Sequence, residues 1–224
     1  MRVGFFDSGV GGTCILEAFR RLCPDEELIY LADSANCPYG NRSVEEIRRL
    51  SENCVKRLLR WRCRLIVVAC NSATAAAIGY LRERYPHIPF VGIEPALKPA
   101  AQGSVSGVVG VLATRATLNG GHYRSTMEKF AKNVKVVAAV ADEFVKAVEA
   151  AELEGPRVER MVCRRVEPLL AAGADRIVLG CTHFPHLKKV IEKVCAGHAE
   201  VVDPSAAVAR QAARLVKSMR RRKA

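Results

Sequence analysis

Two short stretches of this 224-residue chain repeat one pattern, and each leads into a cysteine. The first is Arg64–Ser72 (RLIVVACNS) and the second is Arg176–His183 (RIVLGCTH). Each is an apolar run typical of a strand buried on both faces, followed by a small residue, a cysteine and polar side chains. The repeat predicts two related halves, with a thiol at the end of one strand in each. It also favours a site between the halves, where chemistry reaches both faces of one small molecule.

The rest of the chain alternates strands with helices. Eight short runs rich in Val, Ile and Leu are expected to be strands: Val3–Phe6, Leu28–Leu31, Leu65–Ala69, Phe90–Ile93, Val108–Leu112, Val134–Ala138, Ile177–Leu179 and Glu200–Val202. Ser43 and Glu46 form a capping box for a helix that reaches about Arg62. Gly155-Pro156 opens another helix, which reaches about Ala171. This alternation predicts an α/β fold, with parallel sheets joined by crossover helices.

The repeat also divides the chain into domains. Val3–Gly9 opens the first set of strands, and Val109–Arg115 opens the second with a similar pattern. We expect two similar α/β domains, each a mostly parallel sheet flanked by helices. The first takes residues 1–93 plus 204–224, with the helix from Ser205 packed back on it, and the second takes 94–203. Ligands of such folds bind beyond the carboxyl ends of the strands, so we expect the active site in the cleft between the domains.

Composition narrows the class of protein. The net charge is +12, and six of the Lys and Arg residues lie in positions 214–224. A basic end of this kind binds nucleic acid or forms a solvated helix end, and we favour the second. No apolar run is long enough to span a membrane, and the start of the chain lacks a signal-peptide core, so we expect a cytoplasmic protein. The nine cysteines contain no CxxC pair, which argues against a disulfide framework and a zinc cage.

A glycine-rich loop, Asp7–Gly12, follows the first predicted strand. Its glycines let backbone N–H groups approach a ligand at the start of a helix. The spacing is not GxGxxG, and no lysine follows to make a P-loop, so a nucleotide site is disfavoured. The loop instead suits a small carboxylate held by Ser8 and backbone N–H groups.

A second polar loop follows the second predicted strand. Asp33, which precedes Ser34, would cap a helix or accept a hydrogen bond from an ammonium group. Tyr39 and Gly40, which follow Pro38, would present a ring and a backbone N–H to a ligand. A plain turn explains these residue types equally well, and both interpretations stay open.

The two repeated cysteines are the candidates for chemistry. Cys70 precedes Asn71 and Ser72 at a predicted helix start, where backbone N–H groups stabilise a thiolate. Cys181 is expected at the same position in the second half, and His183 gives it a titratable neighbour. A single such cysteine is usually core packing, but a matched pair favours function.

Three further polar residues lie near these positions. His183 and His186 have the spacing of a metal pair, but no cluster of cysteines or carboxylates completes a ligand set, so we expect no metal. Glu94 follows the fourth strand, and Glu149 follows the sixth at some distance. Either carboxylate would contact the reacting side chains and position them, without contacting the substrate itself.

At this point the chain resembles the cofactor-independent aspartate/glutamate racemase family over nearly its whole length. The segments that carry the resemblance are, in order, Phe6–Gly12, Ala32–Ser34, Pro38–Gly40, Ala69–Asn71, Gly92–Pro95, Ala113–Thr117, Glu154–Pro156 and Leu179–His183. The Asp-Ser-Gly-x-Gly-Gly and Gly-Cys-Thr-His elements are specific when they occur together. Two segments differ from the family pattern: Ser72 stands where threonine is usual, and Ala141–Phe144 replaces a Cys-Pro-Leu-Phe-like run.

The resemblance implies a two-base interconversion of L- and D-glutamate without a cofactor. One thiolate removes the α-proton and the other thiol returns a proton to the opposite face, with Cys70 acting on the D-enantiomer and Cys181 on the L-enantiomer. Asp7 would support Cys70, and His183 would support Cys181. The substrate-binding residues that the resemblance implies are Ser8, Asp33, Ser34, Pro38, Tyr39, Gly40, Asn71, Ser72, Thr114, Thr117, Glu149 and Thr182.

The resemblance further implies a homodimer that supplies D-glutamate for peptidoglycan. Three alternatives remain beside it. The first is a racemase of the same mechanism that acts on aspartate or another amino acid. The second is a nucleic-acid-binding regulatory protein on the same fold, which would use the basic end of the chain. The third is a cysteine hydrolase built on Cys181 and His183, which would leave Cys70 unexplained.

Overall fold

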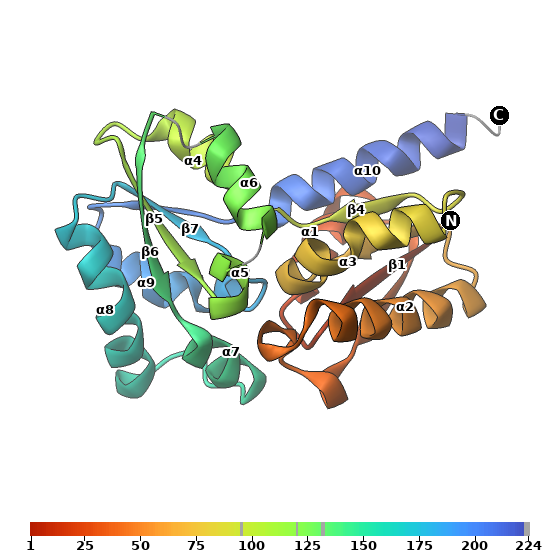
Figure 1. Cartoon of the computed structure of the whole chain (residues 1–224), viewed down its shortest axis with the longest axis horizontal. Helices are drawn as coiled ribbons and strands as arrows, with labels where there is room; N and C mark the ends of the chain where they lie inside the picture. The colour runs from red at the N-terminus through yellow and green to blue at the C-terminus, as the bar shows by residue number, and fades with distance from the viewer. Residues whose placement is uncertain (95, 120, 131–132, 222–224) are drawn as a thin grey trace. The chain divides into compact units, whose positions relative to one another are not determined.

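The computed structural model describes residues 1–94, 96–119, 121–130 and 133–221 (Figure 1). By its internal contacts the chain divides into two compact units, Met1–Glu94 with Pro204–Ala224, and Pro95–Asp203. Each unit holds a four-stranded sheet in which every strand pair is parallel. The expected α/β fold with two parallel sheets flanked by helices is confirmed.

The sheet of the first unit has the order β2-β1-β3-β4. Its strands are β1 (Arg2–Asp7), β2 (Glu27–Ala32), β3 (Leu65–Val68) and β4 (Phe90–Gly92). Its helices are α1 (Thr13–Leu22), α2 (Val44–Arg60), α3 (Asn71–Arg84) and α10 (Ser205–Arg221), with the short 3-10 turns η1 (Ser34–Asn36) and η2 (Tyr39–Asn41). The helix α10 packs on α1, and both belong to this unit.

The sheet of the second unit has the order β6-β5-β7-β8, which repeats that of the first. Its strands are β5 (Val108–Ala113), β6 (Lys135–Val140), β7 (Arg176–Leu179) and β8 (Glu200–Val202). Its helices are α4 (Leu97–Gly103), α5 (Arg115–Asn119), α6 (Gly121–Phe130), α7 (Asp142–Glu149), α8 (Pro156–Ala171) and α9 (Lys188–Cys195), with the 3-10 helix η3 (Phe184–Leu187). All eight expected strands are present, with their ends within two residues of the expected positions.

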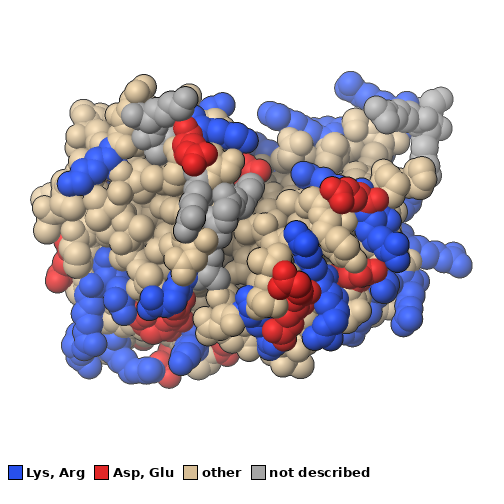
Figure 2. Space-filling model, in the orientation of Figure 1, with Lys and Arg blue, Asp and Glu red and all other residues tan. Residues whose placement is uncertain are grey.

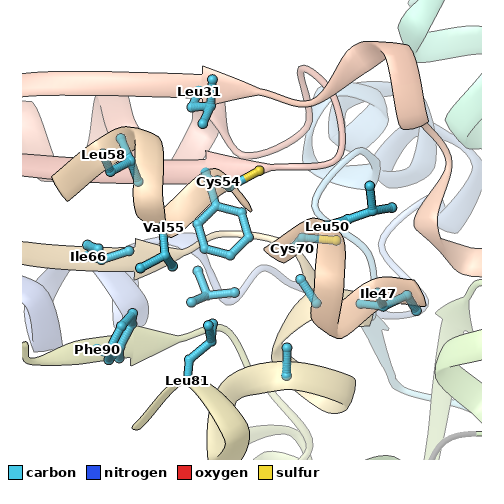
Figure 3. Close-up of a cluster of buried hydrophobic side chains, with 14 of the residues drawn as sticks. Leu31, Ile47, Leu50, Cys54, Val55, Leu58, Ile66, Cys70, Leu81 and Phe90 are labelled. Atoms are coloured by element: carbon cyan, nitrogen blue, oxygen red, sulfur yellow. The ribbon is translucent and has the colours of Figure 1, made fainter. Parts of the chain in front are cut away.

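Burial on both faces explains why the strands read as continuous apolar runs. In β3, Ile66 and Val68 join a core cluster with side chains of α2 and α3, whereas Leu65 and Val67 join one with α1 and α10. Figure 3 shows Ile66 among side chains of α2, and Cys70 belongs to the same cluster. Each such side chain, once buried, contributes about 1.5–3 kcal/mol to folding.

Two helix starts follow the expected local chemistry. The hydroxyl of Ser43 accepts a hydrogen bond from the backbone N–H of Glu46 at 3.2 Å, and α2 begins at the next residue after Ser43. Gly155 adopts φ 101°, a left-handed conformation that suits glycine, and α8 begins at Pro156 directly after it. Within the described residues, no helix combines the length and the apolar composition needed to cross a membrane.

Candidate active site

The two repeated thiols occupy equivalent places in the two sheets. The last registered pair of β1 with β3 ends at Val68, and the last registered pair of β5 with β7 ends at Leu179. Cys70 lies two residues beyond Val68, and Cys181 lies two residues beyond Leu179. Both thiols therefore follow the carboxyl end of the same strand in the repeated topology. Both cysteines are buried, at 5% and 8% exposure.

The strand next to each cysteine strand is followed by a hydroxyl side chain at the equivalent position. Phe6 of β1 pairs with β3, and Leu112 of β5 pairs with β7, at the last position of each ladder. The residues two positions further on are Ser8 and Thr114, and both are buried. The duplicated fold thus sets one thiol and one hydroxyl beyond the central strands of each unit.

In the first unit, Cys70 ends a chain of hydrogen bonds. Its Sγ donates to Ser8 Oγ at 3.7 Å, and Ser8 Oγ donates to Asp7 Oδ1 at 3.2 Å. The same carboxylate oxygen accepts the backbone N–H of Gly9 at 2.9 Å. Asp7 is fully buried, so its carboxylate depends on such bonds. The arrangement links a thiol to a carboxylate through one hydroxyl.

The glycine loop lies tightly against Ala69, which directly precedes Cys70. A Cβ atom at Gly12 would approach the Cβ atom of Ala69 to 2.7 Å, closer than side-chain atoms pack. The hydroxyl of Tyr30 donates to the backbone carbonyl of Gly9 at 2.8 Å. Tyr30 therefore holds the loop from the neighbouring strand β2, a role that no sequence motif marks.

Asp33 holds its own loop in shape. Its carboxylate accepts the Tyr39 hydroxyl at 2.6 Å and the Asn36 amide at 3.0 and 3.1 Å. Asp33 precedes η1, but its side chain makes no cap hydrogen bond there. Burial, helped by the nearby Cys54 thiol and the bond to Asp33, raises the pKa of Tyr39 above its usual range, so the hydroxyl stays a donor. These contacts support the interpretation of Asp33 as a residue that stabilises its own turn.

Asn71 begins α3 directly after Cys70 and is only 6% exposed. Neither atom of its side-chain amide has a hydrogen-bond partner among the described residues. Buried polar atoms without partners are rare and cost about 1–3 kcal/mol each. A bound molecule with both acceptor and donor groups would satisfy them. Ser72 beside it is half-buried.

In the second unit, Cys181 ends a different chain of contacts. Its Sγ lies 3.7 Å from Nδ1 of His183, and Nε2 of His183 lies 2.6 Å from Oε1 of Glu149. His183 is 2% exposed, whereas the Glu149 side chain is 25% exposed. A thiol, an imidazole and a carboxylate are thereby connected, an arrangement that moves a proton to and from sulfur.

Three candidate threonines of the second unit, Thr114, Thr117 and Thr182, are buried. The hydroxyls of Thr114 and Thr117 lie 2.9 Å apart, and the Thr117 N–H donates to the Thr114 hydroxyl at 3.3 Å. Thr182 follows Cys181 directly and is 3% exposed. These are neutral hydrogen-bonding groups, which suit a charged ligand that carries its own counter-charges.

The expectation that Cys181 lies at an α-helix start is wrong. A turn covers Cys181 to His183, and the 3-10 helix η3 follows before α9 begins at Lys188. Phe184 and Leu187 are both fully buried, and the three residues per turn of a 3-10 helix bring two side chains at this spacing directly into line. Cys181 has His183 as its neighbour in place of the helix amides that follow Cys70.

The remaining predicted residues are less enclosed. Ser34, Pro38 and Glu94 are exposed, and Gly40 is half-buried in η2. His186 is half-buried in η3. Burial alone does not assign a role to any of these residues, so the roles given to them from the sequence stay predictions.

Comparison with known proteins decides the family. Residues 13–212 match the Asp/Glu/Hydantoin racemase family. The chain belongs to this family. The resemblance stated from the sequence is therefore confirmed, and the chain is placed among racemases.

Named relatives cover almost all of the chain. The glutamate racemase of Ectopseudomonas mendocina (strain ymp) is 46% identical over 96% of this chain and 81% of its own length. That of Herpetosiphon aurantiacus is 49% identical over 96% of this chain and 84% of its own length. The crystal structure of Escherichia coli glutamate racemase, solved with L-glutamate and the activator UDP-MurNAc-ala, is similar with a TM-score of 0.90 and 35% identity. It matches 96% of this chain and 82% of that one.

Proposed function

We propose that this chain is a cofactor-independent glutamate racemase that exchanges the α-proton through Cys70 and Cys181. The observation that carries the proposal is the equivalent place of the two thiols, each two residues past the same strand of a repeated sheet. A racemase removes a proton from one face of a carbon and adds a proton to the other face. It therefore needs two acid–base groups, and the duplicated thiol provides both. The relatives named as glutamate racemases support this choice of substrate.

In the direction from L- to D-glutamate, Cys181 removes the α-proton as a thiolate. His183 accepts the thiol proton beforehand through Nδ1, and Glu149 holds the imidazole by its bond to Nε2. The imidazole is thereby held where it can take the thiol proton and return it.

Cys70 completes the same reaction as a thiol that protonates the opposite face. After it has given up its proton Cys70 is a thiolate, and it regains a proton that comes from solvent through the Ser8 hydroxyl, which is hydrogen-bonded to Asp7. In the reverse direction the two cysteines exchange roles. Because one half uses a hydroxyl and a carboxylate and the other an imidazole and a carboxylate, we expect the two directions to differ in pH dependence.

The substrate is held by neutral donors and acceptors. The unsatisfied amide of Asn71 is the group best placed to bind it in the first unit, and Thr182 is its counterpart in the second. Fixed donors of this kind stabilise the negative charge that develops when the α-proton leaves. Ser8 and Thr114 contribute buried hydroxyls at equivalent positions.

The biological role follows from the same proposal. D-glutamate formed in the cytoplasm would supply peptidoglycan synthesis, with the enzyme acting as a homodimer. Racemisation of aspartate or another amino acid is the nearest alternative, and it uses the same thiols. The relative activities on glutamate and aspartate separate the two.

Circular dichroism of purified protein with L-glutamate, and separately with D-glutamate, tests the activity without an added cofactor. We expect both signals to decay to zero. Cys70→Ala and Cys181→Ala should each lose activity by about a thousandfold or more, within the range expected for removing an acid or base. Cys163→Ala, at a half-buried cysteine of α8, is the matched control and should keep full activity. Full activity in either of the first two variants would overturn the proposal.

Nucleic-acid binding is a second candidate, carried by the exposed face of α10. Arg210, Arg214 and Lys217 recur every three or four residues and are exposed, and none has an ion-pair partner among the described residues. On this candidate, replacing all three by alanine abolishes salt-sensitive binding of duplex DNA without reducing racemisation. Absence of DNA binding by the unaltered chain would remove this candidate.

A further inference from the structure

A hollow on the second unit lies apart from the residues described above. Its volume is about 480 Å³, and its lining residues are Glu143, Arg157, Arg160, Met161, Arg164 and Arg165. Glu143 belongs to α7 and the others belong to α8. None of them is a candidate residue of the racemase site. Four arginines and a single carboxylate around one small volume make a strongly positive lining.

The arginines converge because of their spacing on one helix. Arg157, Arg160 and Arg164 follow one another by three and four residues, which places them on one face of α8. Arg165 adjoins the same face and contacts α7. Figure 2 shows Lys and Arg side chains gathered over α8, with acidic side chains among them.

Ion pairs within the protein account for only two of the four guanidinium groups. Arg157 pairs with Glu152, and Arg165 pairs with Glu143. Arg160 and Arg164 have no carboxylate within ion-pair distance in the described part of the chain. Another acidic residue of α8, Glu159, pairs with Lys193 of α9 at 2.6 Å and so does not neutralise them.

Helix stability does not explain this placement. The positive end of the helix dipole is at the N-terminus, where cations are unfavourable. Arg157 and Arg160 nevertheless lie in the first turns of α8, and its last turn holds no basic residue. Two of the four arginines thus lie near the end where the helix dipole disfavours cations, and Arg164 and Arg165 lie past the middle of α8, so the helix dipole does not account for any of them.

The chemistry of the lining selects a class of ligand. Guanidinium groups bind phosphate oxygens in pairs of parallel hydrogen bonds. Arg160 and Arg164 are four residues apart, about 6 Å along the helix axis, so two linked phosphoryl groups can engage both at once. The volume lies within the usual range for small-molecule sites, which leaves room for an organic group beside the phosphates.

We propose that α8 and Glu143 of α7 form a binding site for a diphosphate group, either free or as part of a phosphate ester. Arg160 and Arg164 bind the two phosphoryl groups. Arg157 and Arg165 remain held by their carboxylates and supply the surrounding positive field. The site does not depend on the racemase activity.

Isothermal titration of the purified chain with inorganic pyrophosphate, in buffer near physiological salt, tests this proposal. Saturating L-glutamate is included so that the racemase site does not contribute. We expect saturable binding of one pyrophosphate per chain and at least tenfold weaker binding of orthophosphate. Arg160→Ala with Arg164→Ala should weaken pyrophosphate binding at least tenfold.

Two controls separate a specific site from a diffuse positive field. Arg210→Ala with Arg214→Ala removes the same charge from α10 and should leave pyrophosphate binding unchanged. Arg160→Lys with Arg164→Lys keeps the charge but loses the paired hydrogen bonds, and should weaken binding severalfold. No saturable binding, an equal loss in the α10 variant, or unchanged binding in the lysine variant would each overturn the proposal. Circular dichroism of the variants confirms that they remain folded.

Discussion

Nε2 of His183 lies 2.6 Å from Oε1 of Glu149, although the two residues are 34 positions apart in the chain. The contact forms because α7, which ends at Glu149, packs on η3, where Phe144 and Phe184 meet edge to face at 5.1 Å. The packing of the two phenylalanines thus positions Glu149 beside His183. Glu149 contacts Nε2 of the imidazole, which leaves Nδ1 facing Cys181.

Glu149→Gln tests this contact. The amide keeps the shape and a hydrogen bond but removes the negative charge that stabilises the protonated imidazole. We expect kcat with L-glutamate to fall about tenfold to a hundredfold, with little change in KM, and the pH profile of kcat to shift. Glu143→Gln, on the same helix but outside the site, is the control and should leave kcat unchanged. Equal kinetics for the Glu149 variant and the unaltered chain would contradict the assignment.

Asn71→Ala separates function from stability. Removing an amide that has no partner relieves a desolvation cost, so the thermal midpoint should stay the same or rise. The same change should lower kcat/KM at least tenfold, equivalent to about 1.4 kcal/mol of transition-state stabilisation.

Thr74→Ala is the contrasting variant in the same helix. The Thr74 hydroxyl donates to the Val68 carbonyl at 3.1 Å and accepts the Ile93 N–H at 3.2 Å, so it is fully engaged. Its loss should destabilise the chain by about 1–3 kcal/mol in urea unfolding. A clear loss of stability in Asn71→Ala would show that its amide has a structural partner.

Much of the fold is predictable from the sequence because local rules dominate it. The apolar runs around Val67 and Val178 are buried on both faces, and their unbroken apolar sequence, without alternation, indicates that burial directly. Ser43 caps α2 by local chemistry alone. The register that places Cys70 and Cys181 alike follows from the repeated order of strands.

What the sequence did not predict depends on packing between distant segments. The expected helix start at Cys181 was wrong because Phe184 and Leu187 are buried in a tighter turn. The hold of Tyr30 on the glycine loop arises only when β2 pairs with β1. The unsatisfied amide of Asn71 likewise becomes visible only once every neighbouring partner is placed.

Two glycines allow a matched test of packing. Gly12→Ala would bring a Cβ against Ala69 at 2.7 Å, and we expect a loss of about 1–3 kcal/mol in stability together with lower activity. Gly79→Ala, on the exposed side of α3, meets no heavy atom within 4 Å and should stabilise the chain by about 0.5–1 kcal/mol. Urea unfolding measures both, and the same sign for the two variants would contradict the packing account.

Asp175 gives a pH-dependent contribution to stability. Burial acts to raise its pKa, but hydrogen bonds from Ser104, Ser106 and Val105 outweigh burial and lower the pKa from 3.8 to about 2. The stabilisation is therefore present above the unfolded-state pKa and is lost as the pH falls from about 4 to about 2.

Asp175→Asn should accordingly destabilise the chain at pH 7 by about 1 kcal/mol, after allowance for solvent screening at this partly exposed group. Urea unfolding at pH 7, 5 and 3 measures the difference, which should shrink at the lowest pH. A difference of equal size at pH 7 and pH 3 would rule out the charge as its cause.

The two-thiol mechanism is tested most directly by the position of deuterium after reaction in heavy water. In D₂O, the base that removes the α-proton of L-glutamate keeps it as S–H, whereas the opposite thiol carries deuterium from solvent. At early times the D-glutamate formed should hold deuterium at the α-carbon, and the remaining L-glutamate should stay unlabelled, as read by mass spectrometry or proton NMR. Early D-glutamate that retains protium, which is the result of a single base returning the same proton, would contradict the account.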